Sequence, residues 1–310
     1  FGSVLILLSK FLFMSFFDIT FESSEFSKTL NLTSLNISDF FDDLKIITFY
    51  LMANITRIPI LLVCLPILAY IVFLDKENAR IKVDLVDEHY YRPPNWFLEN
   101  AGRYDSYNRN WPAVFAGEYA CHVRDRKNSF YSALCEAAFL TGIERNADIV
   151  HLATYAPLFA HVDAWQWKPD MIWFDNLRSV KSANYYVQQM YSHYPGTSVF
   201  VPKLNNENII GQQGLYATVA SDEAKKQLIV KVANVAKDAQ KISLDIKDLK
   251  LKLTGAGKQI LLKGEMNVEN TLDEPQLIVP VEEKITIDPK KLTLNLDAES
   301  FNVFVFDLEN

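Results

Sequence analysis

Cysteine is scarce in this chain and basic residues are not in excess, which excludes several kinds of protein. The 310 residues contain three cysteines, Cys64, Cys121 and Cys135, too few and too scattered for a disulfide framework or a zinc site. We expect them to be unpaired thiols that pack as small hydrophobic side chains. Acidic residues outnumber basic ones, 38 to 31, and the net charge of -7 argues against nucleic-acid binding.

Several widespread catalytic motifs are also absent. The sequence has no Gly-x-Ser-x-Gly nucleophile elbow, no phosphate-binding P-loop, no Gly-x-Gly-x-x-Gly after a strand and no His-Glu-x-x-His zinc motif. His122 and His193 have no spaced partners of the kind that bind metal ions. We therefore predict neither a metal nor a cofactor. Hydrophobic residues make up 49% of the chain, so a sizeable core is available and global disorder is excluded.

Residues 1–75 differ in composition from the rest, and the sequence supports two interpretations of them. Between Ile46 and Leu74 the only charge is Arg57. The uncharged run from Ile58 to Leu74 falls slightly short of the roughly 20 residues that cross a bilayer, and Ile46 to Thr56 could extend it. Residues 46–74 are therefore a candidate membrane anchor, although Asn54 starts a glycosylation sequon that a span would make unusable. The alternative, slightly favoured by the missing initial methionine, is a segment that does not belong to the folded unit. The predicted location is secreted or membrane-associated.

Residues 76–197 are predicted to be α/β. Short apolar strands are expected at 81–86, 113–116 and 148–155, with a helix from Ser129 to about Arg145 capped by Asn128. A further helix should start near Ser182. Strands that alternate with helices indicate parallel β/α units.

Residues 198–310 are predicted to form an all-β accessory domain. Short strands separated by Asp, Asn, Gly and Lys turns suggest a β-sandwich. The expected strands are 228–232, 241–246, 258–262, 277–281, 284–287, 292–296 and 302–306.

Polar residues follow the predicted strands of the α/β part, where the loops of β/α barrels build active sites. Glu118 directly follows an apolar strand and is the candidate for chemistry, but a buried Glu118 paired with Arg124 or Arg103 is an equally good interpretation. His89 is a candidate base or orienting group, although a core histidine is the more common case. Trp165 and its neighbour Trp167 suit stacking on a sugar ring, and aromatic loops also plug the ends of barrels.

These same stretches resemble the C-terminal part of the catalytic barrel of glycoside hydrolase family 51 α-L-arabinofuranosidases. The matching segments, in order, are VDEHYYRPPNWFLENAGRYDSY, VFAGEYACH, EAAFLTGIERNADIVHLATYAPLFAHVDAWQWKPDMIWFDN and YYVQQMYSHYPGT. The resemblance implies the last three units of a (β/α)8 barrel followed by a β-sandwich. It also implies retaining hydrolysis of terminal α-L-arabinofuranosyl residues, so that the partner is an arabinose-containing oligo- or polysaccharide and the role lies in L-arabinose metabolism.

The resemblance assigns roles to four residues. Glu118 in GEYA matches the catalytic nucleophile at the end of the seventh barrel strand. His89 and Tyr91 match the His-x-Tyr pattern that lines the sugar site after the sixth strand and positions the nucleophile. Gln166 matches a substrate-contacting glutamine after the eighth strand.

One essential part of the family pattern is missing. The family's general acid/base is a glutamate in a Gly-Asn-Glu motif on an earlier strand, and the sequence has no such motif. The first five barrel strands should precede Ile81, where the apolar segment stands instead. Asp87 and Glu88 lie close to the site in sequence, so either could lie beside Glu118, but the family pattern gives neither of them the acid's role. The chain is therefore expected to carry the nucleophile half of the site, the alternative being an inactive, membrane-tethered carbohydrate-binding or structural remnant. The sequence predicts no oligomeric state.

Overall fold

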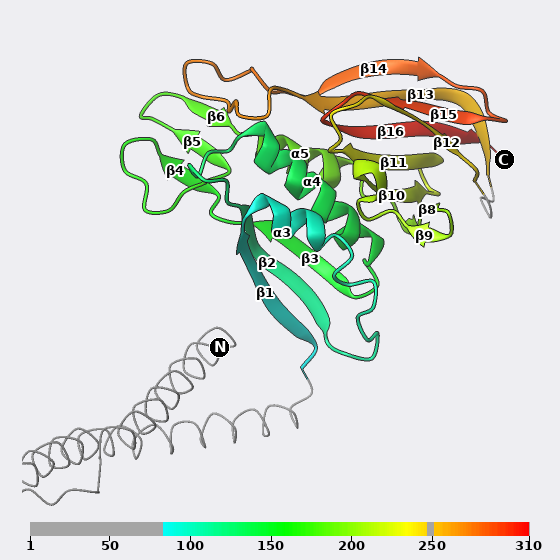
Figure 1. The fold of residues 1–310 in the computed structure, drawn as a ribbon, viewed down its shortest axis with the longest axis horizontal. Helices are drawn as coiled ribbons and strands as arrows, with labels where there is room; N and C mark the ends of the chain where they lie inside the picture. The colour runs from blue at the N-terminus through cyan, green and yellow to red at the C-terminus, as the bar shows by residue number, and fades with distance from the viewer. Residues whose placement is uncertain (1–82, 247–250, 310) are drawn as a thin grey trace, which may run out of the picture. The chain divides into compact units, whose positions relative to one another are not determined.

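Three helices lie between a parallel sheet and a larger antiparallel sheet in the computed structural model, which describes residues 83–246 and 251–309 (Figure 1). The parallel sheet has the order β1-β2-β3. Its strands are β1 (Leu85–Arg92), β2 (Ala113–Cys121) and β3 (Val150–Tyr155). Helix α3 (Pro94–Glu99) follows β1, α4 (Phe130–Arg145) joins β2 to β3, and α5 (Ala183–His193) follows β3. This alternation of parallel strands and helices is what the sequence predicts.

The first two strands are longer than the apolar runs that predict them. Strand β1 continues to Arg92 and β2 to Cys121, because the ladder between them persists through the pairs His89–Glu118 and Arg92–Cys121. The expectation that the polar residues come after the strands was therefore wrong: they lie within the last part of the ladder. Backbone pairing does not depend on side-chain polarity, so the hydrophobic pattern ended before the strand did.

Serines, not Asn128, cap the two longer helices. The side chain of Ser129 accepts from the backbone N–H of Ser132 at the start of α4, and Ser182 does the same for Tyr185 at the start of α5. The predicted start near Ser182 is confirmed, and the assignment of Asn128 as a cap was wrong. Asn128 is buried instead, and its amide nitrogen donates to the Tyr155 hydroxyl at 3.1 Å and to Asn184 at 3.0 Å.

One face of the parallel sheet packs on the helices and the other is open. Tyr90 and Tyr119 both make edge contacts with Phe139 of α4. Since successive side chains of a strand point to opposite faces, the neighbours His89, Tyr91 and Glu118 lie on the face that α4 does not cover. Strand β3 adds Leu152 there, half exposed.

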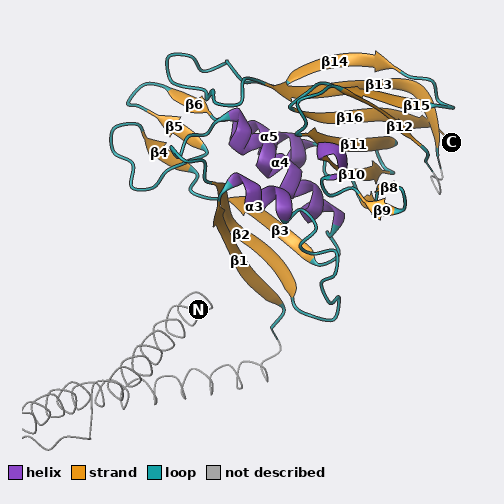
Figure 2. Ribbon diagram, in the orientation of Figure 1, coloured by secondary structure: helices purple, strands orange, loops and turns teal. Residues whose placement is uncertain are grey.

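The C-terminal part is built from two sheets packed face to face, which is the arrangement of a β-sandwich. The larger sheet has the order β14-β13-β16-β11-β10-β7, and the smaller pairs β12 with β15 (Figure 2). Their bounds are β7 (Ser198–Phe200), β10 (Leu215–Asp222), β11 (Gln227–Asn234), β12 (Gln240–Leu244), β13 (Lys252–Lys263), β14 (Val281–Thr286), β15 (Leu292–Leu296) and β16 (Ser300–Glu309).

The six-stranded sheet has two buried faces. On β16 (Ser300–Glu309), Phe301, Val303 and Val305 belong to the core shared with the helices. Phe304, Phe306 and Leu308 belong to a second core shared with β12 and β15. Side chains of one strand thus alternate between two cores, so α4 and α5 cover one face of the sheet and the small sheet covers the other.

The sandwich strands were predicted unevenly. The runs 228–232, 241–246, 258–262, 284–287, 292–296 and 302–306 all fall wholly or largely on observed strands. The run 277–281 was wrong, because β14 begins only at Val281. Strand β10 was missed because its sequence, LYATVASD, is rich in small residues although it is almost wholly buried.

A buried ion pair joins α4 to the six-stranded sheet. The ammonium of Lys231, fully buried in β11, contacts the carboxylate of Glu144 near the end of α4. The same ammonium lies 5.1 Å from the centre of the Tyr191 ring. Burial lowers the pKa of Lys231, and burial raises the pKa of Glu144. The charge of each partner counteracts this effect of burial on the pKa of the other.

The remaining elements are short and connect the larger ones. A small sheet of order β4-β5-β6 follows β3, and β8 pairs with β9 ahead of one 3-10 turn. Their bounds are β4 (Phe159–His161), β5 (Ile172–Phe174), β6 (Ser179–Lys181), β8 (Lys203–Leu204), β9 (Glu207–Asn208) and η1 (Gln212–Gly214). Among residues 83–246 and 251–309, no helix has the length and apolar character needed to cross a membrane. The predicted anchor at 46–74 lies outside these residues.

Candidate functional site

The carboxylate of Glu118 lies on the open face of the parallel sheet with two side chains of β1 turned towards it. The Tyr91 hydroxyl donates to its Oε2 at 2.7 Å, and Nδ1 of His89 lies 3.4 Å from the same oxygen. The Glu118 side chain is 42% exposed, so it remains open to a ligand. The structure thus brings together three of the five residues predicted from the sequence.

Tyr91, which donates to Glu118, stacks on a second aromatic ring. Burial first, and then the hydrogen bond to Glu118, raise the pKa of Tyr91 well above its usual range, so the phenol keeps its proton. The ring of His122 stacks on that of Tyr91 with centroids 5.4 Å apart, and Arg126 contacts its Nδ1. Burial and the Arg126 charge lower the pKa of His122 to about 4. His122 was not predicted to be a site residue, because the sequence shows only that it has no metal-binding partners at a suitable spacing.

Glu88 turns away from Glu118 to the helix side of β1. Its carboxylate accepts from the Tyr104 hydroxyl at 2.8 Å and from Arg103 at 3.1 Å. Burial alone would raise the pKa of Glu88, but the hydrogen bonds from Tyr90 and Tyr104 and the Arg103 charge lower it. The expectation that Glu88 might partner Glu118 was therefore wrong, as was the pairing of Glu118 with Arg103, because strand alternation separates the two faces.

Trp165 and Gln166 lie in the loop between β4 and β5, with exposed side chains. They make none of the contacts to Glu118 found in the part of the chain that the structure describes. The loop is nevertheless anchored at the same edge of the sheet, because Trp173 of β5 donates to the buried Asn128 at 2.9 Å. Asn128 in turn bonds to Tyr155, the last residue of β3.

A buried glutamate supports the end of β2. Oε1 of Glu136, on α4, accepts from the backbone N–H of Cys121 at 2.7 Å, three residues beyond Glu118. Oε2 has no hydrogen-bond partner among the described residues. Burial raises the pKa of Glu136 to about 8. The group is therefore neutral at pH 7 and leaves no unpaired charge in the core.

Glu136 is expected to make stability fall as the pH rises. Its pKa is near 8 in the folded protein and near 4.5 as an ordinary carboxyl, so between those values the unfolded chain binds fewer protons. From pH 6 to 8 this contributes a loss of about 2 kcal/mol in the free energy of unfolding. Glu136→Gln keeps the acceptor for Cys121 and should remove that slope in urea titrations.

Asp170 supplies the control for that measurement. Burial raises its pKa to about 6, so Asp170→Asn should change the slope mainly below pH 6. An unchanged slope above pH 6 in Glu136→Gln would contradict the assignment.

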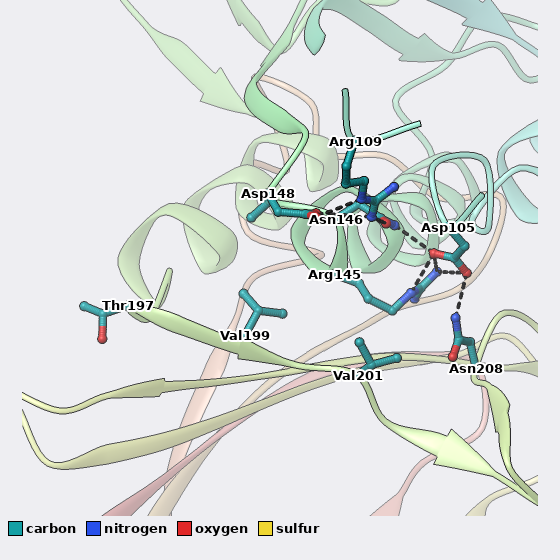
Figure 3. A pocket seen from close by; sticks show the side chains of 10 residues that line it. Asp105, Arg109, Arg145, Asn146, Asp148, Thr197, Val199, Val201 and Asn208 are labelled. Atoms are coloured by element: carbon teal, nitrogen blue, oxygen red, sulfur yellow. Dashed lines mark hydrogen bonds and ion pairs between the residues drawn. The ribbon is translucent and has the colours of Figure 1, made fainter. Parts of the chain in front are cut away.

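A cavity of about 520 Å³ lies near the N-terminal ends of the strands of the parallel sheet (Figure 3). Its lining includes Arg109, which precedes β2, and Asp148, which precedes β3, whereas Glu118 lies towards the strand ends. All five donors of Arg109 are used, by Asp148, Asn146 and the carbonyls of Tyr104 and Tyr107. This cavity is therefore a polar junction between α4 and β7, separate from the Glu118 cluster.

The described residues 83–246 and 251–309 contain no group of three or more His, Cys, Asp or Glu side chains arranged to hold a metal ion. Cys121 and Cys135 are free and buried, as expected, and Cys64 lies outside the described residues. What the site offers is a partly exposed carboxylate with a phenol and an imidazole aimed at one oxygen. That arrangement suits a carboxylate nucleophile, as in covalent glycoside hydrolysis.

Comparison with known proteins identifies the family of the chain. Residues 105–300 match the model of the α-L-arabinofuranosidase C-terminal domain. The chain belongs to this family.

Individual relatives agree with the family match. An extracellular exo-α-L-arabinofuranosidase of Streptomyces chartreusis is 52% identical over 128 residues, 41% of this chain and 15% of that protein. α-L-Arabinofuranosidase 2 of Arabidopsis thaliana is 29% identical over 223 residues, 71% of this chain and 33% of that protein. An arabinose-bound family 51 α-L-arabinofuranosidase structure superposes with a TM-score of 0.66 and 30% identity, covering 73% of this chain and 37% of that one. The chain thus spans about a third or less of the curated relatives it matches.

Proposed function

We propose that Glu118 is the nucleophile of a retaining α-L-arabinofuranosidase. The observation that carries the proposal is the Glu118 carboxylate on the open sheet face, with the Tyr91 hydroxyl at 2.7 Å and His89 at 3.4 Å from one oxygen. In this mechanism the carboxylate attacks the anomeric carbon and forms a glycosyl-enzyme that water then hydrolyses. The hydrogen bond from Tyr91 orients one oxygen and leaves the other free to attack.

The parallel sheet is proposed to be the last three strands of a (β/α)8 barrel. Its open face supports this, because Leu85 and Leu152 are apolar and exposed there, as side chains of a barrel interior would be without the other strands. Both β1 and β3 are edge strands, which a closed barrel would not have. Residues 76–197 would then form the barrel portion and 198–310 the accessory sandwich.

The substrate is proposed to be a terminal α-L-arabinofuranosyl residue of an oligo- or polysaccharide, with Trp165 and Gln166 contacting it from the loop after β3. The names of the Streptomyces and Arabidopsis relatives support this substrate class. The Streptomyces protein is described as extracellular, which supports a secreted location for this one.

The chain is proposed to supply the nucleophile half of the reaction. Retention needs a second carboxyl group about 5–5.5 Å from the first to protonate the leaving oxygen. Neither Asp87 nor Glu88 takes that role, since Asp87 is bonded to His89 and Glu88 lies on the other face. Natural arabinosides, which have poor leaving groups, should therefore be hydrolysed very slowly by these 310 residues alone.

A donor that needs no acid tests the proposal. Incubation with 2,4-dinitrophenyl α-L-arabinofuranoside should add one pentose to the chain, detectable in the intact mass, and peptide mapping should place it on Glu118. An adduct on another residue would overturn the nucleophile assignment. Absence of any adduct, with arabinose still bound, would favour a carbohydrate-binding remnant, and rapid turnover of a natural arabinoside would show that an acid is present.

A further inference from the structure

A bulge in β2 creates the space that a second carboxylate, Asp87, occupies beside the site. The register pairs Asp87 with Phe115 and His89 with Glu118, so two steps along β1 correspond to three along β2. The additional residue falls at Ala116–Gly117. Bulges next to active sites commonly re-aim a side chain, and this one places Glu118 opposite His89.

Gly117 is required for this arrangement. A Cβ atom built on Gly117 would lie 2.0 Å from Oδ1 of Asp87, far inside any allowed contact. The Asp87 carboxylate therefore fills the volume that a side chain at position 117 would take. The proposed nucleophile Glu118 is thus preceded by the glycine whose missing side chain leaves room for Asp87.

From that position Asp87 holds the ring of His89. Oδ2 of Asp87 lies 2.9 Å from Nε2 of His89, while Nδ1 of the same ring lies 3.4 Å from Oε2 of Glu118. A ring fixed at one nitrogen cannot rotate the other away. Within the described residues, Asp87 is the group that bonds to Nε2.

We propose that Asp87 is a positioning residue for the nucleophile: it fixes the orientation of His89, which in turn keeps the Glu118 carboxylate in its attacking geometry. The inference rests on the proposed function, since it presumes that Glu118 attacks a sugar. Among the described residues Asp87 bonds to His89 and has no hydrogen bond to Glu118, so it acts on the nucleophile through His89. If Asp87 has this role, the reaction depends on Asp87, Gly117 and the bulge in β2 as well as on Glu118, His89 and Tyr91.

Three variants and one control test the role. Asp87→Ala removes the acceptor, Asp87→Asn keeps an acceptor oxygen of the same size, and Gly117→Ala displaces the carboxylate. Asp84→Ala removes an exposed carboxylate just ahead of β1 and serves as the matched control. For each, the rate of pentose transfer from the dinitrophenyl donor is measured against donor concentration, and the ring ¹⁵N signals of His89 are recorded by NMR, assigned with His89→Gln.

We expect Asp87→Ala and Gly117→Ala to lower the maximal transfer rate by about 10²-fold, the typical cost of a small misplacement, with little change in the half-saturating concentration. Asp87→Asn should recover most of the rate, and Asp84→Ala should behave as the parent chain. The His89 ring signals should shift in Asp87→Ala and Gly117→Ala but not in the control.

The two measurements separate the two proposals. If the parent chain forms no adduct, the proposed function fails, while the NMR signals still show whether Asp87 fixes the His89 ring. Unchanged His89 signals in Asp87→Ala would overturn the positioning role. So would an unchanged transfer rate despite shifted signals.

Discussion

Glu118→Gln should abolish pentose transfer to the chain, with a fall of at least about 10³-fold in the rate of adduct formation. An amide has almost the shape of a carboxylate but lacks the charge needed to attack an anomeric carbon. The amide oxygen of the variant side chain can still accept from Tyr91, so the hydrogen bond that holds this side chain is retained. The loss should therefore appear in chemistry and not in folding.

The controls for this substitution are direct. Glu283→Gln changes an exposed carboxylate of β14, far from the parallel sheet, and should leave the transfer rate unaltered. Thermal unfolding of Glu118→Gln should match that of the parent chain within a few degrees. Equal adduct formation by Glu118→Gln and the parent chain would remove Glu118 from the reaction.

Lys231→Met should lower the free energy of unfolding by about 3–5 kcal/mol, because it leaves the Glu144 carboxylate buried without its cation. Lys231 is fully buried and the Glu144 side chain is 13% exposed, so water cannot replace the ammonium at full strength. The loss should be smaller at pH 5 than at pH 8, since a protonated Glu144 needs no partner. Urea unfolding at both values measures it.

The single variant Glu144→Met and the double variant Lys231→Met with Glu144→Met complete a thermodynamic cycle. Two apolar side chains of similar volume replace the pair, so most of the lost stability should return, as is common when both members of a buried pair are exchanged. A single-variant loss below about 1 kcal/mol would mean that the pair behaves as a surface salt bridge.

The sequence predicted the type of most elements, because their apolar periodicity matched how they pack. Strand β15, Leu292–Leu296, was predicted to the residue, since every second side chain enters the core between the two sheets. Strand ends were predicted less well. The backbone ladder between β1 and β2 continues past the ends of the two predicted apolar runs, and the side-chain pattern does not indicate this. Strand β10 was not predicted, because its small buried residues give no clear apolar alternation.

The site was predictable only as far as the family motifs and strand positions reached. Glu118, His89 and Tyr91 came from these, and the structure puts all three in contact. The bond from His89 to Asp87 depends on a bulge that adds one residue to β2, which the sequence does not reveal. The stack of His122 behind Tyr91 depends on the turn after β2, where Arg126 adopts a positive φ of 59°.

The six-stranded sheet shares one of its cores with α4, a helix that precedes it in the chain by more than fifty residues. Tyr191 of α5 stacks on Phe301 of β16 with the rings nearly parallel, at an angle of 10°, and Lys231 reaches Glu144 across the same contact. A chimera that exchanged only the sandwich between two relatives would therefore present α4 and α5 with a foreign surface. Recombination should succeed when the crossover lies ahead of β2, so that helices and sandwich are inherited as one piece. The family match, which begins at residue 105 and thus includes both helices, has this boundary.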